Sequence, residues 1–389
     1  MKLSIFIIFF LTSLLAVAQQ KKDLSKENPG GIKSAESSKD VVTQSKMDKF
    51  NAKAEKLFVY IPVPIISYTQ ETGNNIGLAK FNMINFYKND TITTPSKISA
   101  LATVSTLGNI KTFVNWKVFF KNDQHLTGGR LGYRFFPEYI VGQGNKPSFD
   151  SLEQITNKAY VVNISYARQL IKNNFFGIGY NFRNFVEIQK QPDSFLTRDN
   201  ILGNDGGRVS GLNFFYVYDN RKNRYTPSNG MYFEVSTKIN SPTYGSDYKY
   251  IDFSVDARKY FKVFKNHVIA TQAFWGLQSG DIPYFDLYKL GGDSRMRGYY
   301  LGGLRDANIF DAQIEYRMPI WNIFGATAWV GKGKVYGIDD HLDFKDLWTS
   351  YGVGLRVMVD SKSKTNLRFD LGINGYGSHA FIINFSEAF

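Results

Sequence analysis

From residue 57 onward, apolar and polar residues alternate along the chain in short runs. The run IDFSVDAR at residues 251–258 places its four apolar side chains on one face and Asp252, Ser254, Asp256 and Arg258 on the other. The same alternation recurs at residues 232–239, 311–318 and 366–373. A period of two is that of a β-strand with one apolar and one polar face. The pattern therefore predicts a protein made of many such strands.

Two features favour a membrane barrel over a water-soluble sandwich. The polar face often carries several charges, as at Asp252, Asp256 and Arg258, which suits a wet lumen. Tyr, Phe and Trp stand near the ends of the predicted strands, as in the aromatic girdles of outer-membrane barrels. The fold class we predict is all-β, a transmembrane antiparallel β-barrel.

The connections between strands alternate in length. Lys-Asn pairs begin at residues 88, 121, 172, 222 and 265 and predict short turns on one side of the membrane. Longer segments at residues 136–154, 189–206, 279–306 and 331–347 predict loops on the other side. At about 20 residues per strand and connection, residues 58–389 hold roughly sixteen strands. These begin near Ile61, Asn75, Ser96, Lys111, Gln124, Lys158, Asn174, Gly207, Met231, Tyr248, Asn266, Ala307, Trp321, Leu347, Thr365 and Ser378.

Residues 1–18 have the pattern of a secretory signal peptide. Lys2 provides a positive start, residues 3–15 are almost wholly apolar, and Ala16-Val17-Ala18 is a small-x-small cleavage site. The alternative is a buried helix or a membrane anchor, but the apolar run is short for a span. We therefore expect an exported protein, located in the outer membrane of a Gram-negative bacterium.

Residues 19–56 are polar and precede the barrel that we predict at residues 57–389. They contain many Lys, Ser, Asn and Asp residues, and we expect a mostly disordered periplasmic tail. A short helix at residues 43–56 is an open alternative. A segment of this length is too short for a periplasmic domain of any size.

The charge and the cysteine count narrow the choice of partners. Lys and Arg total 47 against 34 Asp and Glu, a net charge of +13, and there is no Cys. For an exported chain, anionic outer-membrane lipid or lipopolysaccharide is a better counterpart than nucleic acid. A solvated surface excess without a partner is the alternative. Without Cys there is neither a disulfide framework nor a site for a lipid on a terminal Cys.

The sequence contains no pattern that indicates catalysis. The four histidines, His125, His267, His341 and His379, are scattered and do not have metal-ligand spacing. Neither a phosphate-binding Gly-Lys-Ser loop nor a Gly-x-Ser-x-Gly elbow is present. We expect no enzyme activity, no metal and no cofactor.

Residues 291–300, GGDSRMRGYY, follow neither strand nor helix periodicity. Here the chain resembles the BamA/TamA superfamily of outer-membrane assembly and translocation barrels, also called the bacterial surface-antigen family. The likeness is carried by Gly291, Gly292 and the run Arg297, Gly298, Tyr299, which matches the family's Arg-Gly-aromatic loop motif. Further matching residues are Tyr218-Asp219-Asn220-Arg221 with Pro227 and Gly230, Glu315-Tyr316-Arg317 with Pro319, Tyr351-Gly352-Val353-Gly354-Leu355-Arg356, and Arg368-Phe369-Asp370.

The resemblance implies that the long loop folds back into the lumen and that its Arg bonds acidic groups on the inner wall. Arg297 would be that Arg, and Glu315, which faces inward by the alternation, is its best partner. The family has an acidic residue in the next strand, where this chain has Trp329-Val330-Gly331-Lys332-Gly333. Asp370 or Asp311 is therefore the candidate for a second partner. The alternative is an ordinary surface loop.

The resemblance also implies a function in protein insertion or translocation, with unfolded client barrels or protein partners. The family's insertases usually carry repeated small domains before the barrel, and we expect a short form without them. The barrel would open to a client at a weak seam between its first and last strands. The first strand runs from Ile61 to Tyr68, and the last from Phe381 to Phe385 with the terminal Phe389. An accessory or structural barrel in a larger complex and a passive pore are the alternatives.

Overall fold

The computed structural model describes residues 62–69, 72–84, 86–87, 93–146, 152–224, 226–264, 266–321, 323–360, 365–385 and 387–389. The predicted signal peptide at residues 1–18, the predicted tail at 19–56 and Ile61 lie outside these residues. No helix among the described residues is long and apolar enough to cross a membrane.

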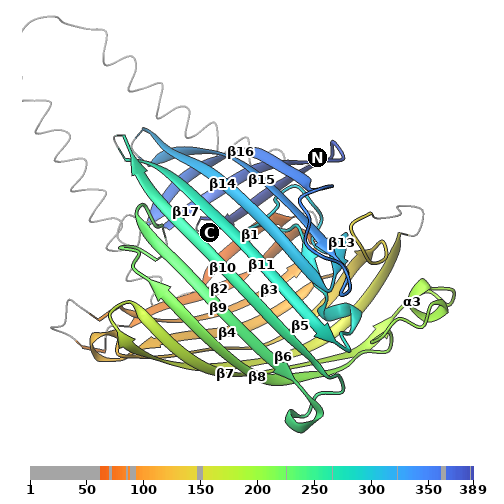
Figure 1. Ribbon diagram of the computed structural model, residues 1–389. Helices are drawn as coiled ribbons and strands as arrows, with labels where there is room; N and C mark the ends of the chain where they lie inside the picture. Colours follow the sequence, from red (N-terminus) through yellow and green to blue (C-terminus); the bar gives the residue numbers. More distant parts are fainter. Residues whose placement is uncertain are drawn as a thin grey trace, which may run out of the picture. The chain divides into compact units, whose positions relative to one another are not determined.

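Sixteen antiparallel strands of the described part of the chain close into a barrel (Figure 1), so the prediction of about sixteen strands is confirmed. Sequence neighbours pair around the barrel, β11 pairs with β14 across the longest loop, and β18 returns to β1. Each strand begins within five residues of its predicted position. The barrel strands are β1 (Val63–Thr69), β2 (Gly73–Ile84), β3 (Ser96–Ser105), β4 (Ile110–Phe119), β5 (His125–Ile140), β6 (Glu153–Ile171), β7 (Asn174–Gln189), β8 (Gly207–Asp219), β9 (Gly230–Asn240), β10 (Tyr250–Val263), β11 (His267–Gly280), β14 (Asn308–Trp321), β15 (Phe324–Tyr336), β16 (Trp348–Asp360), β17 (Thr365–Asn374) and β18 (His379–Phe385).

The distribution of buried and exposed side chains is the reverse of that in a soluble protein. Val353 and Leu355 are each 58% exposed on the outside of the barrel, whereas Glu315 and Asp370 are completely buried inside it. An apolar exterior is favourable only against lipid, and a charged interior is stable only when its charges are paired. The alternation seen in the sequence is therefore apolar toward the membrane and polar toward the lumen.

Short turns join the strands at one end of the barrel. Residues 172–173 join β6 to β7, and Asn173 has a positive φ of 67° in this tight turn. Asn122, in the short helix η1 (Lys121–Asp123) between β4 and β5, has a φ of 58°. Asn adopts this conformation more easily than most residues, which explains the repeated Lys-Asn pairs.

The long loops gather at the other end, where Figure 1 shows β13 (Leu304–Asp306) together with α3 (Phe195–Arg198). The loops predicted at 136–154 and 331–347 are shorter than expected, because β5 continues to Ile140 and β15 continues to Tyr336. The loop between β11 and β14 has structure of its own that the alternation did not predict: η4 (Tyr284–Asp286) and a two-stranded sheet of β12 (Tyr288–Leu290) and β13. One further helix, η3 (Pro242–Tyr244), lies between β9 and β10.

A hydrophobic cluster packs the β7–β8 loop together with the β11–β14 loop. Phe285 from the β11–β14 loop stacks on Phe185 of β7 at 4.0 Å between ring centroids, and Leu196 of α3 belongs to the same cluster. The β5–β6 connection crosses to the β11–β14 loop, where the amide of Gly144 donates to the Arg305 carbonyl oxygen at 2.8 Å. The loop end of the barrel is therefore covered by packed structure.

Candidate functional site, a loop held inside the barrel

The GGDSRMRGYY segment forms a compact turn inside the lumen. Gly291 and Gly292 have φ of 108° and 102°, a region that favours glycine, and the Gly292 amide donates to the Tyr299 carbonyl oxygen at 3.1 Å. Met296 and Tyr299 are buried in a cluster with Ile309 of β14 and Val335 of β15. The segment is thus packed against the inner wall.

Arg297, at the tip of this turn, is completely buried and bonds two wall carboxylates. Its Nη2 donates to Glu315 Oε2 at 2.5 Å, and its Nη1 donates to Asp370 Oδ2 at 2.8 Å. The guanidinium also lies over the ring of Trp329, 3.7 Å from the centroid. Charge-assisted bonds to two carboxylates and a stacked aromatic ring together stabilise this buried arginine, although its Nε has no hydrogen-bond partner among the described residues.

Each of these carboxylates is shared with a further arginine of the wall. Arg317 Nε donates to Glu315 Oε1 at 2.7 Å, and Arg356 Nη1 donates to Asp370 Oδ1 at 2.6 Å. Arg368 Nη1 donates to Asp370 Oδ2 at 3.2 Å. We call Arg297, Glu315, Arg317, Arg356, Arg368 and Asp370 the Arg297 cluster.

Backbone contacts fix the loop beside the cluster. Gly298 has a φ of 106°, and its backbone approaches that of Gly372 in β17 so closely that a Cβ on Gly372 would lie 2.8 Å from the Gly298 nitrogen. Ser350 Oγ donates to the Arg297 carbonyl oxygen at 2.5 Å, and Asn374 Nδ2 donates to that of Gly298 at 3.0 Å. The loop is therefore held by its main chain as well as by its arginine.

Tyr299, the aromatic residue of the motif, joins the loop to β16 and to the β17–β18 connection. Its hydroxyl donates to the Thr349 carbonyl oxygen at 2.9 Å and accepts from the Gly375 amide at 2.7 Å. Burial raises the pKa of the Tyr299 hydroxyl, against the opposing effect of these backbone bonds. The hydroxyl therefore stays protonated and keeps donating.

The structure places the predicted acidic partners on two different arginines of the loop. Glu315 and Asp370 bond Arg297, whereas Asp311 pairs with Arg295 at 3.2 Å. Contacts of Asp293, Trp329 and Gly372 with the loop and its cluster were missed by the sequence interpretation. The only signal for them was position in the sequence: Asp293 stands inside the motif, Trp329 stands where the chain departs from the family's acidic residue, and Gly372 follows the matching run Arg368-Phe369-Asp370.

A second acidic site holds the outer part of the loop. Glu138 of β5 is buried and accepts from Lys289 Nζ at 2.8 Å and from Arg305 Nη2 at 3.3 Å. Burial lowers the pKa of the Lys289 ammonium to about 8, while the charge of Glu138 acts in the opposite direction. The carboxylate thus stabilises two cations that the lumen would otherwise disfavour.

Glu138→Gln is expected to loosen β12 and β13 without releasing Arg297. An amide keeps one acceptor but loses the charge, so we expect a loss of about 1–2 kcal/mol in the free energy of unfolding. Hydrogen exchange should become faster at residues 288–290 and 304–306 and stay slow at 297–299. Equal acceleration in both stretches would show that the loop opens as one unit and would contradict this expectation.

The seam between β1 and β18 has the least regular pairing of the barrel. Among the described residues it contains one register pair, Tyr68 with Ile383, whereas β1 and β2 share seven. Across the seam, the rings of Tyr68 and Phe381 lie 6.5 Å apart.

The prediction that Phe389 belongs to the seam is wrong. β18 ends at Phe385, and Phe389 is buried inside the barrel against Tyr260 of β10 and Val268 and Ala270 of β11. The chain leaves the sheet because its aromatic ring finds an apolar site on the inner wall.

The family-like residues around Asp219 close the turn end of β8 and β9. Asp219 Oδ1 accepts from Arg221 Nε at 2.8 Å, and Asp219 Oδ2 pairs with Arg224 Nε at 3.0 Å. Arg224 in turn lies over the ring of Phe119, 4.9 Å from the centroid. These contacts support a structural role for this motif.

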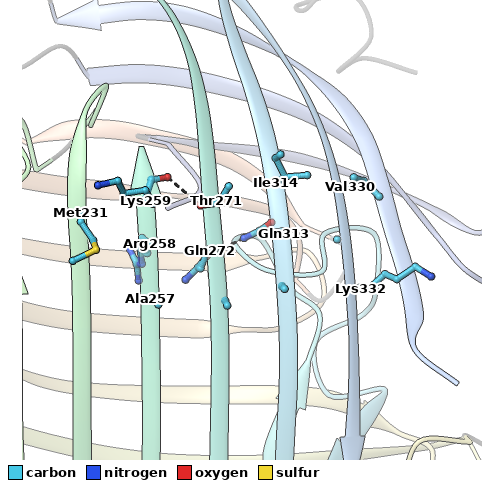
Figure 2. Close-up of a pocket in the computed structure, with 13 residues that line it drawn as sticks. Met231, Ala257, Arg258, Lys259, Thr271, Gln272, Gln313, Ile314, Val330 and Lys332 are labelled. Carbon is cyan, nitrogen blue, oxygen red and sulfur yellow. Dashed lines mark hydrogen bonds between the residues drawn. The ribbon is translucent and has the colours of Figure 1, made fainter. Parts of the chain in front are cut away.

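A shallow groove of about 630 Å³ crosses the wall formed by β9, β10, β11, β14 and β15. Ala257, Ala273 and Ala312 follow one another in register across β10, β11 and β14 and form its floor. Figure 2 shows Lys259 and Lys332 at its two sides. Among the described residues, no three His, Asp or Glu side chains are placed to hold a metal ion.

Comparison with known proteins points to one family. The model of the Omp85 superfamily domain matches residues 94–389. The structure of BamA from Haemophilus ducreyi lacking POTRA domains 1–3 is 13% identical with a TM-score of 0.56, and the match covers 95% of this chain and 81% of that one.

Two structures of CdiB are also similar. CdiB from Escherichia coli is 10% identical with a TM-score of 0.58, covering 82% of this chain and 61% of that one. CdiB from Acinetobacter baumannii is 14% identical with a TM-score of 0.52, covering 84% and 59%. At these identities the likeness is one of fold.

Proposed function

The chain belongs to the Omp85 superfamily of outer-membrane β-barrels, and on this premise we propose that it assists the insertion or translocation of proteins at the outer membrane through the seam between β1 and β18. The observation that carries the proposal is the seam itself. Among the described residues one register pair joins β1 to β18, so a strand of another chain that pairs with either edge would have little regular pairing to displace. By contrast, β17 and β18 share seven pairs, so β18 stays with the wall when the seam opens.

The held loop supports this role. A barrel that opens at one seam loses the hydrogen bonds that close it there. The Arg297 cluster joins β14 to β17 from inside the lumen and does not depend on those bonds. The proposed role of the cluster is to keep this part of the wall together while β1 moves away from β18. Arg297 is a positioning residue in this mechanism, which requires neither a catalytic group nor a cofactor.

A reversible lock across the seam tests the proposal. Because the chain has no Cys, Tyr68→Cys with Ile383→Cys introduces a single disulfide between directly opposed residues. The matched control is Val353→Cys with Leu371→Cys, which crosslinks β16 to β17 at an opposed pair away from the seam. In cells depleted of the native protein, we expect the control to restore the outer-membrane proteome and the oxidised seam variant to fail until it is reduced.

The outcomes separate the candidate functions. If the oxidised seam variant restores the proteome as well as the control, the seam is not the route. If depletion leaves other outer-membrane proteins unchanged, the assembly role is wrong and the accessory barrel is favoured. A passive pore is the weakest candidate, because the Arg297 cluster and the packed loops occupy the lumen and its outer end. Single-channel conductance that is large in the native protein would reverse that order.

Outer-membrane lipid and lipopolysaccharide are the partners we propose for the exterior. The exposed apolar residues of the strands face lipid chains, and the alanine groove offers space for one of them. Lys259 and Lys332 line this groove, and we propose that their ammonium groups bind lipid phosphates. Unfolded client barrels or protein partners are proposed for the seam, and we propose no nucleic-acid partner.

A further inference from the structure

Residues 387–389 lie inside the barrel, where they touch strands far from β18. Glu387 Oε2 accepts from Arg356 Nε of β16 at 2.9 Å, and Glu387 Oε1 accepts from Asn366 Nδ2 of β17 at 2.6 Å. The Phe389 main-chain oxygen accepts from Arg317 Nη2 of β14 at 3.0 Å. The Phe389 ring reaches β10, where its centroid lies 6.4 Å from that of Tyr260. The segment therefore crosses the inner wall from β17 to β10.

Two of these contacts are made by Arg317 and Arg356, two of the three arginines that share the carboxylates of Arg297. Arg317 bonds Glu315 and the Phe389 oxygen, and Arg356 bonds Asp370 and Glu387. The loop at Arg297 and residues 387–389 are thus joined by two chains of contacts. One runs through Glu315 and Arg317, and the other runs through Asp370 and Arg356.

The charges of the cluster require a further acid. Arg297, Arg317, Arg356 and Arg368 are four buried cations, and among the described strand residues only Glu315 and Asp370 pair with them. Asp293 of the loop approaches Arg368 at 3.7 Å, and Glu387, whose side chain is 5% exposed, approaches Arg356. Removing one partner from a buried ionic network leaves an uncompensated charge, which is strongly unfavourable.

A second connection runs from β18 itself to the loop. Asn384 Nδ2 donates to Asp293 Oδ2 at 2.5 Å, and Arg368 Nη2 donates to the Asp293 main-chain oxygen at 2.6 Å. The last strand and the segment that follows it therefore both contact the loop network.

We propose that residues 387–389 form an internal anchor, in which Glu387 completes the charge balance of the Arg297 cluster and Phe389 fills the apolar site at Tyr260. The anchor couples the end of β18 to the loop, so that release of one loosens the other. Glu387 and Phe389 are positioning residues in this device. The inference concerns the protein alone and does not depend on the assembly role.

A single cysteine at Ala388→Cys reports the anchor in the purified full chain, which has no other cysteine. Ala388 packs against the cluster of Tyr260, Val268, Ala270 and Phe389, so a bulky hydrophilic maleimide should react slowly. In the Glu387→Gln background, we expect the reaction to be about tenfold faster, because local opening exposes the thiol. Hydrogen exchange at residues 293–298 should become faster in parallel.

Glu187→Gln is the matched control. It removes the charge of a carboxylate that pairs with Lys158 at a 58% exposed position, and it should change neither readout. If Glu387→Gln fails to fold, Phe389→Ala keeps every charge and gives the same two measurements.

Three results would overturn the proposal. The first is a thiol at 388 that reacts in the native protein as fast as in the unfolded chain. The second is equal behaviour of the Glu387→Gln and Glu187→Gln variants. The third is a faster thiol reaction without faster exchange in the loop, because the coupling would then be absent. Assembly activity enters none of these measurements, so a failed assembly role leaves the test intact.

Discussion

Arg297→Ala is expected to lower the free energy of unfolding by about 3–5 kcal/mol, because it leaves buried carboxylates without their central partner. Arg297 is completely buried, and so are both of its acceptors, Glu315 and Asp370. Arg317 and Arg356 remain bonded to them, but neither can replace the contact that joins loop to wall. The loop should then leave the wall, and protease should cleave between residues 291 and 300.

Equilibrium unfolding in urea with lipid vesicles measures the first effect, and limited proteolysis of the folded barrel measures the second. Arg297→Lys is the informative comparison, since an ammonium keeps the charge but cannot bond two carboxylates with one planar fork. We expect it to fall between the native protein and Arg297→Ala. A native-like loop and unchanged stability in Arg297→Ala would show that the backbone contacts of Gly298 and Tyr299 hold the loop alone.

Most of the barrel could be predicted from the sequence because a strand carries its own pattern. Alternation identifies the strand and its inner face, and Lys-Asn pairs mark turns, with a positive φ at Asn122, Asn173 and Asn266. Alternation does not show where a strand ends when the strand continues beyond the membrane. β5 and β15 extend into the loop region for this reason, and the short pairing of β12 with β13 has no period to read.

The site could be predicted in part, for a similar reason. The alternation of its own strand predicts that Glu315 faces the lumen, and in the structure Glu315 bonds Arg297. The choice between Asp370 and Asp311 depends on the loop's path across three strands, which no local pattern fixes. Nothing in the sequence indicated that residues 387–389 leave the line of β18, because the run FIINFSEAF still alternates well enough to continue a strand.

Gly372→Ala is expected to displace the loop although it adds only one methyl group. The new Cβ would lie 2.8 Å from the Arg297 carbonyl carbon and 2.8 Å from the Gly298 nitrogen, closer than real Cβ contacts. Both are main-chain atoms held by Ser350 and Asn374, so no flexible side chain can move aside. Overpacking of this kind typically lowers the free energy of unfolding by about 1–3 kcal/mol, and more where the backbone is fixed.

Gly128→Ala is the matched control for this substitution, since Gly128 also lies in a barrel strand. A Cβ there would meet its nearest neighbour, Ser165 Oγ, at 3.4 Å, which is ordinary contact. Proteolysis between residues 291 and 300 and hydrogen exchange at 297–299 should increase in Gly372→Ala and stay native-like in Gly128→Ala. If both variants keep the loop protected, β17 can move away from the loop without releasing Arg297, and the guanidinium bonds rather than the close backbone packing set the position of the loop. If only Gly372→Ala releases it, the Gly298–Gly372 approach is as necessary to the held loop as the buried charges are.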